Sequence, residues 1–283
     1  MSLVEVFALL ALAILEGSLV ALPRALALAP LARLQSPAWA ATLPGFILTG
    51  TLVPLWHPGF ASAIAVLSAV ATPLMAVLAA ATVARGRRPL LLATITIALG
   101  VTLILGVEGW LPASIVTAFG CMAVGVALVR LIPRPWLVAA VVATACLDAA
   151  LLAMHVGQPA AALMAHATAH LHGRAFDGAI VGPVTVDYPD LVLAGALGGF
   201  VAGKPLQGRA ALSVTVLAAA SAMLLAVIRI VPETVPIALI FVLVASAKNP
   251  PFRRRSSPLF AAALARWPRS AGPRRSKVCA IES

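Results

Sequence analysis

Nine apolar runs of about twenty residues each, separated by short loops, constrain this chain more than any other feature of its sequence. A helix of about 20 residues spans the roughly 30 Å hydrocarbon core of a bilayer. Hydrophobic residues make up 62% of the chain and charged residues only 10%, which excludes an ordinary soluble domain. We therefore predict an all-α, polytopic membrane protein with about nine transmembrane helices. The predicted spans are Leu3–Leu22, Trp39–Trp56, Phe60–Ala84, Pro89–Val107, Leu111–Leu131, Trp136–Met154, Val184–Gly203, Ala210–Ile228 and Ile230–Ala247.

The positions of the basic residues orient these spans, because Lys and Arg concentrate in the cytoplasmic loops of membrane proteins. Of the 20 basic residues, 18 lie after the first, third, fifth and seventh predicted spans or in the C-terminal tail. Only Arg174 and Arg229 fall on the other side. The pattern predicts an outside N-terminus and a cytoplasmic C-terminus. Arginine outnumbers lysine 17 to 3, which is typical of a GC-rich prokaryote, so we expect a multi-pass protein of a prokaryotic plasma membrane.

The spans divide the chain into four expected parts. Residues 1–154 form a six-helix N-terminal membrane part, and residues 184–247 form a three-helix C-terminal membrane part. An extracytoplasmic loop, 155–183, lies between them and holds four of the five histidines. Residues 248–283 form a basic tail that we expect to be disordered and to bind anionic lipids of the inner leaflet. The net charge of +11 also raises the alternative of nucleic-acid binding, but lipid binding is the favoured interpretation.

The histidine-containing loop offers the weak metal-ligand candidates of the sequence. His166 and His170 stand four residues apart, which places two imidazoles on one helical face, and His172 follows closely. Such a pair suits Zn²⁺ or Cu²⁺. No Cys or acidic residue stands beside them at a firm spacing, so we expect a solvated histidine-rich segment and no cofactor.

Two aspartates lie within the predicted spans. Asp148 interrupts the run VVATACLDAALLAM, where a central Asp costs about 2.5–3.5 kcal/mol on insertion scales. Asp190 lies in VDYPDLVLAGALGGF. Because the sixth span runs outward and the seventh inward, each carboxylate is expected about 9 Å below the outer surface. The structural alternatives are a hydrogen bond between helices for Asp148 and a helix cap for Asp190.

Two carboxylates at one depth would support a specific chemistry if they meet. In a low-dielectric site they cannot both ionise, so the pair holds one proton. The ionised member can then take a proton from water while the protonated member polarises a peptide carbonyl. The same carboxylates could instead bind a proton or a cation during transport.

Three segments in order resemble the intramembrane aspartic proteases of the presenilin and signal peptide peptidase type. Asp148 lies in the sixth span, where this family has Tyr-Asp. Asp190 lies in the seventh, in YPDLVLAG, where the family has Gly-x-Gly-Asp before an apolar run. The ninth span carries Pro236-Ile237-Ala238-Leu239, where the family has Pro-Ala-Leu. Nine spans with an outside N-terminus are similar to the signal peptide peptidase branch.

The resemblance implies an intramembrane aspartic endopeptidase that cuts transmembrane segments of other membrane proteins without a cofactor. Asp148 and Asp190 would be its catalytic pair, and Pro236, Ile237, Ala238 and Leu239 would position the unwound substrate. Two alternatives stay open: a proton- or cation-coupled transporter that uses the same carboxylates, and a catalytically inactive homologue. The second arises because Leu147 replaces the family's Tyr, and Asp187 and Pro189 replace its glycines.

Overall fold

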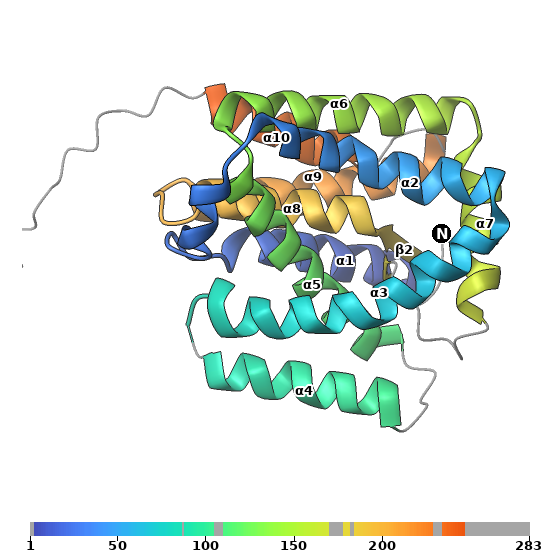
Figure 1. The fold of residues 1–283 in the computed structure, drawn as a ribbon, viewed down its shortest axis with the longest axis horizontal. Coiled ribbons are helices and arrows are strands. Elements are labelled where there is room, and N and C mark those ends of the chain that lie inside the picture. Colours follow the sequence, from blue (N-terminus) through green and yellow to red (C-terminus); the bar gives the residue numbers. More distant parts are fainter. Residues whose placement is uncertain are drawn as a thin grey trace, which may run out of the picture. The chain divides into compact units, whose positions relative to one another are not determined.

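A computed structural model describes residues 3–86, 88–104, 110–169, 178–181, 184–228 and 234–246. These residues belong to one compact unit, which is mostly helical and is drawn in Figure 1. Short 3₁₀ segments, Ala29–Leu34 and Pro37–Ala41, precede α2, and a π-helical turn, Ala79–Val83, extends α3. The elements are α1 (Leu3–Ala21), α2 (Thr42–Trp56), α3 (Pro58–Leu78), α4 (Arg88–Ile104), α5 (Trp110–Leu131), α6 (Arg134–Ala153), α7 (Gly157–Ala169), β1 (Gly178–Val181), β2 (Val184–Asp187), α8 (Tyr188–Val201), α9 (Gln207–Ile228) and α10 (Thr234–Ser246).

In the described part of the chain, five helical segments are long and apolar enough to cross a membrane, and three further apolar helices are shorter. Large apolar side chains such as Leu67, Leu74 and Ile97 are more than 60% exposed. Apolar surface of this extent is typical of a protein whose surroundings are lipid. The chain therefore has the architecture of a multi-pass integral membrane protein. The five long segments are Val4–Ala21, Pro37–Trp56, Pro58–Val83, Leu111–Leu131 and Arg134–Ala153.

The segment between α6 and α8 corrects two sequence expectations. Residues 155–183 are not a plain loop, because they contain α7 and strand β1. The segment Val184–Asp187, expected to begin a transmembrane helix, is strand β2 and pairs antiparallel with β1, so the fold is not purely helical. The β-branched run Val184-Thr185-Val186 favours a strand. Pro189 then suits the first turn of α8, where its missing N–H costs nothing.

Helix α8 is the centre of the packing, since every residue from Asp190 to Val201 is buried. Glycines let its neighbours approach closely. A Cβ atom at Gly195 would lie 2.7 Å from the Met122 Cα of α5, and one at Gly198 would lie 2.6 Å from the Leu19 carbonyl oxygen of α1. Small residues serve the same purpose at the interfaces of membrane helices in general. The 14 residues of α8 reach only about 21 Å, less than a bilayer, but protein surrounds them.

Several helix ends meet at one end of the bundle, on the left in Figure 1. The Arg24 N–H donates to the Val83 carbonyl at 3.0 Å, and the Arg85 N–H donates to the Leu22 carbonyl at 2.8 Å. These bonds join the end of α1 to the end of the π-helical turn after α3. The hairpin β1–β2 and α7 lie at the opposite end of the helices (Figure 1).

Gln207, the first residue of α9, connects the α8–α9 turn to the C-terminal end of α1. Its amide nitrogen donates to the carbonyls of Val20, Ala21 and Pro23 at 2.8–3.1 Å, and its amide oxygen accepts from the Gly203 N–H. The side chain is buried, so it satisfies carbonyls that α1 leaves open at its C-terminus. The loops after α1, the α3 extension and α8 are thus locked together.

Gly195→Ala is expected to destabilise the protein, because the added methyl group meets the backbone of α5 with no room to move. Overpacking of this kind costs about 1–3 kcal/mol. Gly50→Ala on α2 is the matched control: its Cβ would meet nothing within 4 Å, and Ala favours a helix over Gly. In detergent, the thermal unfolding midpoint of Gly195→Ala should be lower than that of the wild type, and the midpoint of Gly50→Ala should be unchanged or higher. Equal midpoints would contradict the central role of this contact.

Candidate functional site

Asp148 contacts the beginning of α10. It lies on α6, is half-buried, and its Oδ2 accepts a hydrogen bond from the Thr234 hydroxyl at 2.7 Å. Thr234 is the first residue of α10 and is itself buried. The structure therefore gives Asp148 a hydrogen bond between helices, which was the structural alternative considered for it, at the helix that also carries Pro236.

Asp190 lies in the first turn of α8 and is only 4% exposed. The cap of α8 is Asp187, so the interpretation of Asp190 as the helix cap is wrong. The helix begins at Tyr188, so Asp190 is its third residue and not one six residues inside it, as the predicted span had it. A carboxylate in a first turn is stabilised by the positive end of the helix dipole.

Helix α10 connects the two aspartate-bearing helices. It packs against α6 and against α8, whereas α6 and α8 are not a closely packed pair among the described elements. The rings of Phe200 on α8 and Phe241 on α10 lie 4.8 Å apart, centroid to centroid. Of the four residues that resemble the Pro-Ala-Leu motif, Pro236, Ile237 and Ala238 are buried and Leu239 is exposed. The two segments that carry Asp148 and Asp190 therefore share one neighbour, α10, and this helix carries the third segment.

A polar frame fixes the start of α8 beside Asp190. The Tyr188 side chain interacts with the Cys121 side chain of α5. The Tyr188 ring meets Phe46 of α2 edge to face at 6.3 Å. On the adjacent hairpin, the Ser114 hydroxyl of α5 donates to the Ile180 carbonyl at 2.8 Å and accepts from the Ile180 N–H at 2.7 Å. Asp190 is thus held on a helix whose entry is fastened to α5.

Sequence reasoning missed the residues that build this frame. Tyr188 is the one tyrosine of the chain, and it stands two residues before Asp190, which was the available signal. Thr234 stands two residues before Pro236 and could have been found in the same way. Ser114 and Cys121 have no such signal, because their partners are far away in sequence.

The metal candidates are not brought together by the described part of the chain. His166 lies on α7 and is exposed, while His170 and His172 fall outside the described residues. Among the residues that are described, no three His, Cys, Asp or Glu side chains form a group that could hold a metal ion. Of the three candidates only His166 is described, and its helix α7 packs against α2 and α3.

Comparisons with protein-family models, with curated proteins and with solved structures found no match for this chain. A function for it has to be argued from its own residues. The arrangement that bears on function is the contact of α10 with the two helices that carry Asp148 and Asp190.

Proposed function

We propose that the protein is an intramembrane aspartic endopeptidase with Asp148 and Asp190 as its catalytic pair. The observation that carries the proposal is the position of α10, which is hydrogen-bonded to Asp148 through Thr234 and packs against the helix of Asp190. This brings the Pro236–Leu239 segment into the neighbourhood of both aspartate-bearing helices. The resemblance in sequence assigns substrate positioning to that same segment.

The chemistry needs one water molecule between the two carboxyl groups. The ionised carboxylate takes a proton from the water as the water oxygen attacks the peptide carbonyl carbon. The protonated carboxyl group donates a hydrogen bond to the carbonyl oxygen. Collapse of the tetrahedral intermediate breaks the C–N bond, and the leaving nitrogen receives a proton from the pair. Because α10 contacts both α6 and α8, a substrate segment beside it would lie against both helices that carry the aspartates.

The proposal includes the finer topology of nine spans, with the N-terminus outside and the C-terminus in the cytoplasm. Two structural facts support it: the basic loops after α1 and the α3 extension are hydrogen-bonded together, and the hairpin beside Asp190 lies at the opposite end (Figure 1). The catalytic pair would then open toward the outer half of a plasma membrane. Its partners would be transmembrane segments of other proteins.

A proton- or cation-coupled transporter is the second candidate. Two observations favour it: α6 and α8 do not pack closely on each other, and α1 carries a further buried carboxylate, Glu16, which is 4% exposed. Carboxylates distributed over several helices are typical of proton and cation pathways.

Asp148→Asn and Asp190→Asn should each abolish cleavage of a model transmembrane substrate in reconstituted vesicles. Loss of a general acid or base lowers the rate by about 10²–10⁴-fold, so the product band on a gel should disappear. Asp187→Asn is the matched control, since Asp187 is exposed and Asn caps a helix as well as Asp does.

Three outcomes decide between the candidates. No cleavage by the wild type across several substrates would refute the protease, and cleavage that survives either substitution would refute this pair. Uptake of protons or cations into vesicles that is lost in the same two variants, without any cleavage, would establish the transporter.

Thr234→Val should slow cleavage by about ten- to a hundredfold, because it removes a hydrogen bond to a charged group worth about 1.5–3 kcal/mol. Thr234 is a positioning residue in this view, so the effect should fall on kcat and not on KM. Thr234→Ser keeps a hydroxyl and should restore most of the rate. Thr49→Val, which removes an exposed hydroxyl bonded only to its own helix, should leave both constants unchanged. A loss shared by the Ser variant would count against the hydrogen bond.

A further inference from the structure

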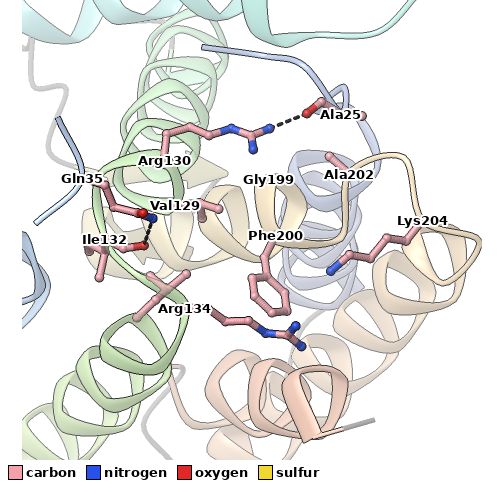
Figure 2. Close-up of a pocket in the computed structure, with 11 residues that line it drawn as sticks. Ala25, Gln35, Val129, Arg130, Ile132, Arg134, Gly199, Phe200, Ala202 and Lys204 are labelled. Atoms are coloured by element: carbon pink, nitrogen blue, oxygen red, sulfur yellow. Dashed lines mark hydrogen bonds between the residues drawn. The ribbon is translucent and has the colours of Figure 1, made fainter. Parts of the chain in front are cut away.

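A pocket of about 300 Å³ lies where α5 ends, α6 begins and α8 turns into α9 (Figure 2). This end of the bundle is the one at which the basic loops meet. The volume is at the lower limit of small-molecule sites. Its lining residues are Ala25, Gln35, Val129, Arg130, Ile132, Arg134, Leu137, Gly199, Phe200, Ala202 and Lys204.

The pocket is cationic. Arg130, Arg134 and Lys204 line it, and none of its described lining residues is acidic. Figure 2 shows Arg134 and Lys204 beside the ring of Phe200. The Arg134 Cζ lies 5.1 Å and the Lys204 Nζ 4.2 Å from the centroid of that ring. Cation–π attraction thus holds two like charges near each other on one buried aromatic surface.

Hydrogen bonds to backbone carbonyls fix the guanidinium groups. Arg130 donates from Nε to the Ala27 carbonyl at 3.1 Å and from an Nη to the Ala25 carbonyl. Arg134 donates from an Nη to the Ala245 carbonyl of α10 at 3.1 Å. These bonds account for one or two of the five N–H donors of each arginine. The pocket is therefore organised without using up its capacity to bind an anion.

The cations repel one another across the pocket. Burial, and then the charge of Arg134, lower the pKa of Lys204 below its ordinary value. The facing groups are Gln35 from the α1–α2 connection, Arg130 from α5, Arg134 from α6 and Lys204 from the α8–α9 turn. The first turn of α6 adds positive potential, because its cap position is Pro133 and no side chain caps it. A bound anion would relieve this repulsion.

We propose that this pocket binds a phosphate group, carried either by the headgroup of an anionic phospholipid or by a soluble phosphate compound. Guanidinium groups bind phosphate through paired, charge-assisted hydrogen bonds, and Lys204 supplies a third cation. Basic pockets between transmembrane helices on the cytoplasmic side hold anionic lipid headgroups in other membrane proteins. The site does not depend on whether Asp148 and Asp190 are catalytic.

Binding can be tested on the full chain, purified in a non-ionic detergent and in phosphate-free buffer. One arm adds inorganic phosphate against chloride at equal ionic strength and follows the thermal midpoint. The other arm adds phosphatidylglycerol or phosphatidylcholine and counts bound lipid by native mass spectrometry. Lys204→Gln and Arg130→Gln should weaken binding by at least about tenfold. Arg33→Gln is the control, since Arg33 is an exposed arginine of the same region that does not line the pocket.

Each outcome has a defined meaning. A shift of the thermal midpoint with inorganic phosphate identifies a soluble ligand. Selective retention of phosphatidylglycerol identifies a lipid headgroup. Either result supports the site when Lys204→Gln weakens the effect and Arg33→Gln does not. Absence of both effects, or equal losses in the three variants, would overturn the proposal. Should Arg130→Gln fail to fold, Lys204→Gln alone decides, because the Lys204 side chain makes its described contact with a ring face only.

The pH dependence of binding gives a separate readout. The pKa of Lys204 is lowered, so its positive charge is complete at low pH and is lost at a lower pH than for an ordinary lysine. The arginines stay charged throughout. Affinity for phosphate should therefore fall in the alkaline range as Lys204 deprotonates, and this fall should be absent in Lys204→Gln. An identical alkaline fall in both proteins would exclude Lys204 as a ligand.

Discussion

The close contact of α8 with α5 and α1 is the constraint on which the rest of this structure depends. Gly195 and Gly198 lack the side chains that would hold the neighbouring helices apart. Gly125 on α5 does the same from the other side, since a Cβ atom there would overlap the Val192 carbonyl oxygen. In lipid, helices gain little from apolar burial against one another, because the surrounding tails are equally apolar. Close packing is then a main source of cohesion. A short helix that is buried over its whole length has to be held by such contacts.

The central position of α8 determines where polar groups can lie. Its N-terminus carries Asp190, and there the Tyr188 side chain interacts with Cys121 of α5. Its C-terminus leads to Gly203, whose N–H donates to the amide oxygen of Gln207. Buried polar groups have to be hydrogen-bonded, and in the apolar body of this protein the ends of helices are the places that offer partners. Asp190 therefore lies at one end of α8, and Lys204 follows the other end.

The sequence predicted the positions of the helices well but did not predict the contacts between them. Among the described residues, the five long apolar segments and the three shorter apolar helices each match a predicted span, because a lipid environment requires continuous apolar runs that are visible in the sequence. The hairpin was missed, since a short apolar run such as Val184-Thr185-Val186 fits a strand or a helix equally well by periodicity. Because of that error, Asp190 was expected six residues inside the helix, whereas it is the third residue of α8. The bond between Asp148 and Thr234 joins residues 86 positions apart, and a local pattern carries no information about such a pair.

The cationic pocket could not be predicted for the same reason. Its arginines were counted as loop charges, and only the fold shows that they line one cavity.

Helix α10 links the two sites. At its start Thr234 donates to Asp148 near the end of α6, and at its other end the Ala245 carbonyl accepts from Arg134, the first residue of α6. The two helices are thus antiparallel and joined by one polar bond at each end, over about 17 Å of α10. Arg134 is also a lining residue of the cationic pocket. A phosphate group that drew the Arg134 guanidinium toward itself would compete with the Ala245 carbonyl, and the bond that remained would be the one beside Asp148. The Pro236–Leu239 segment thus lies on a helix that is hydrogen-bonded to α6 at both ends.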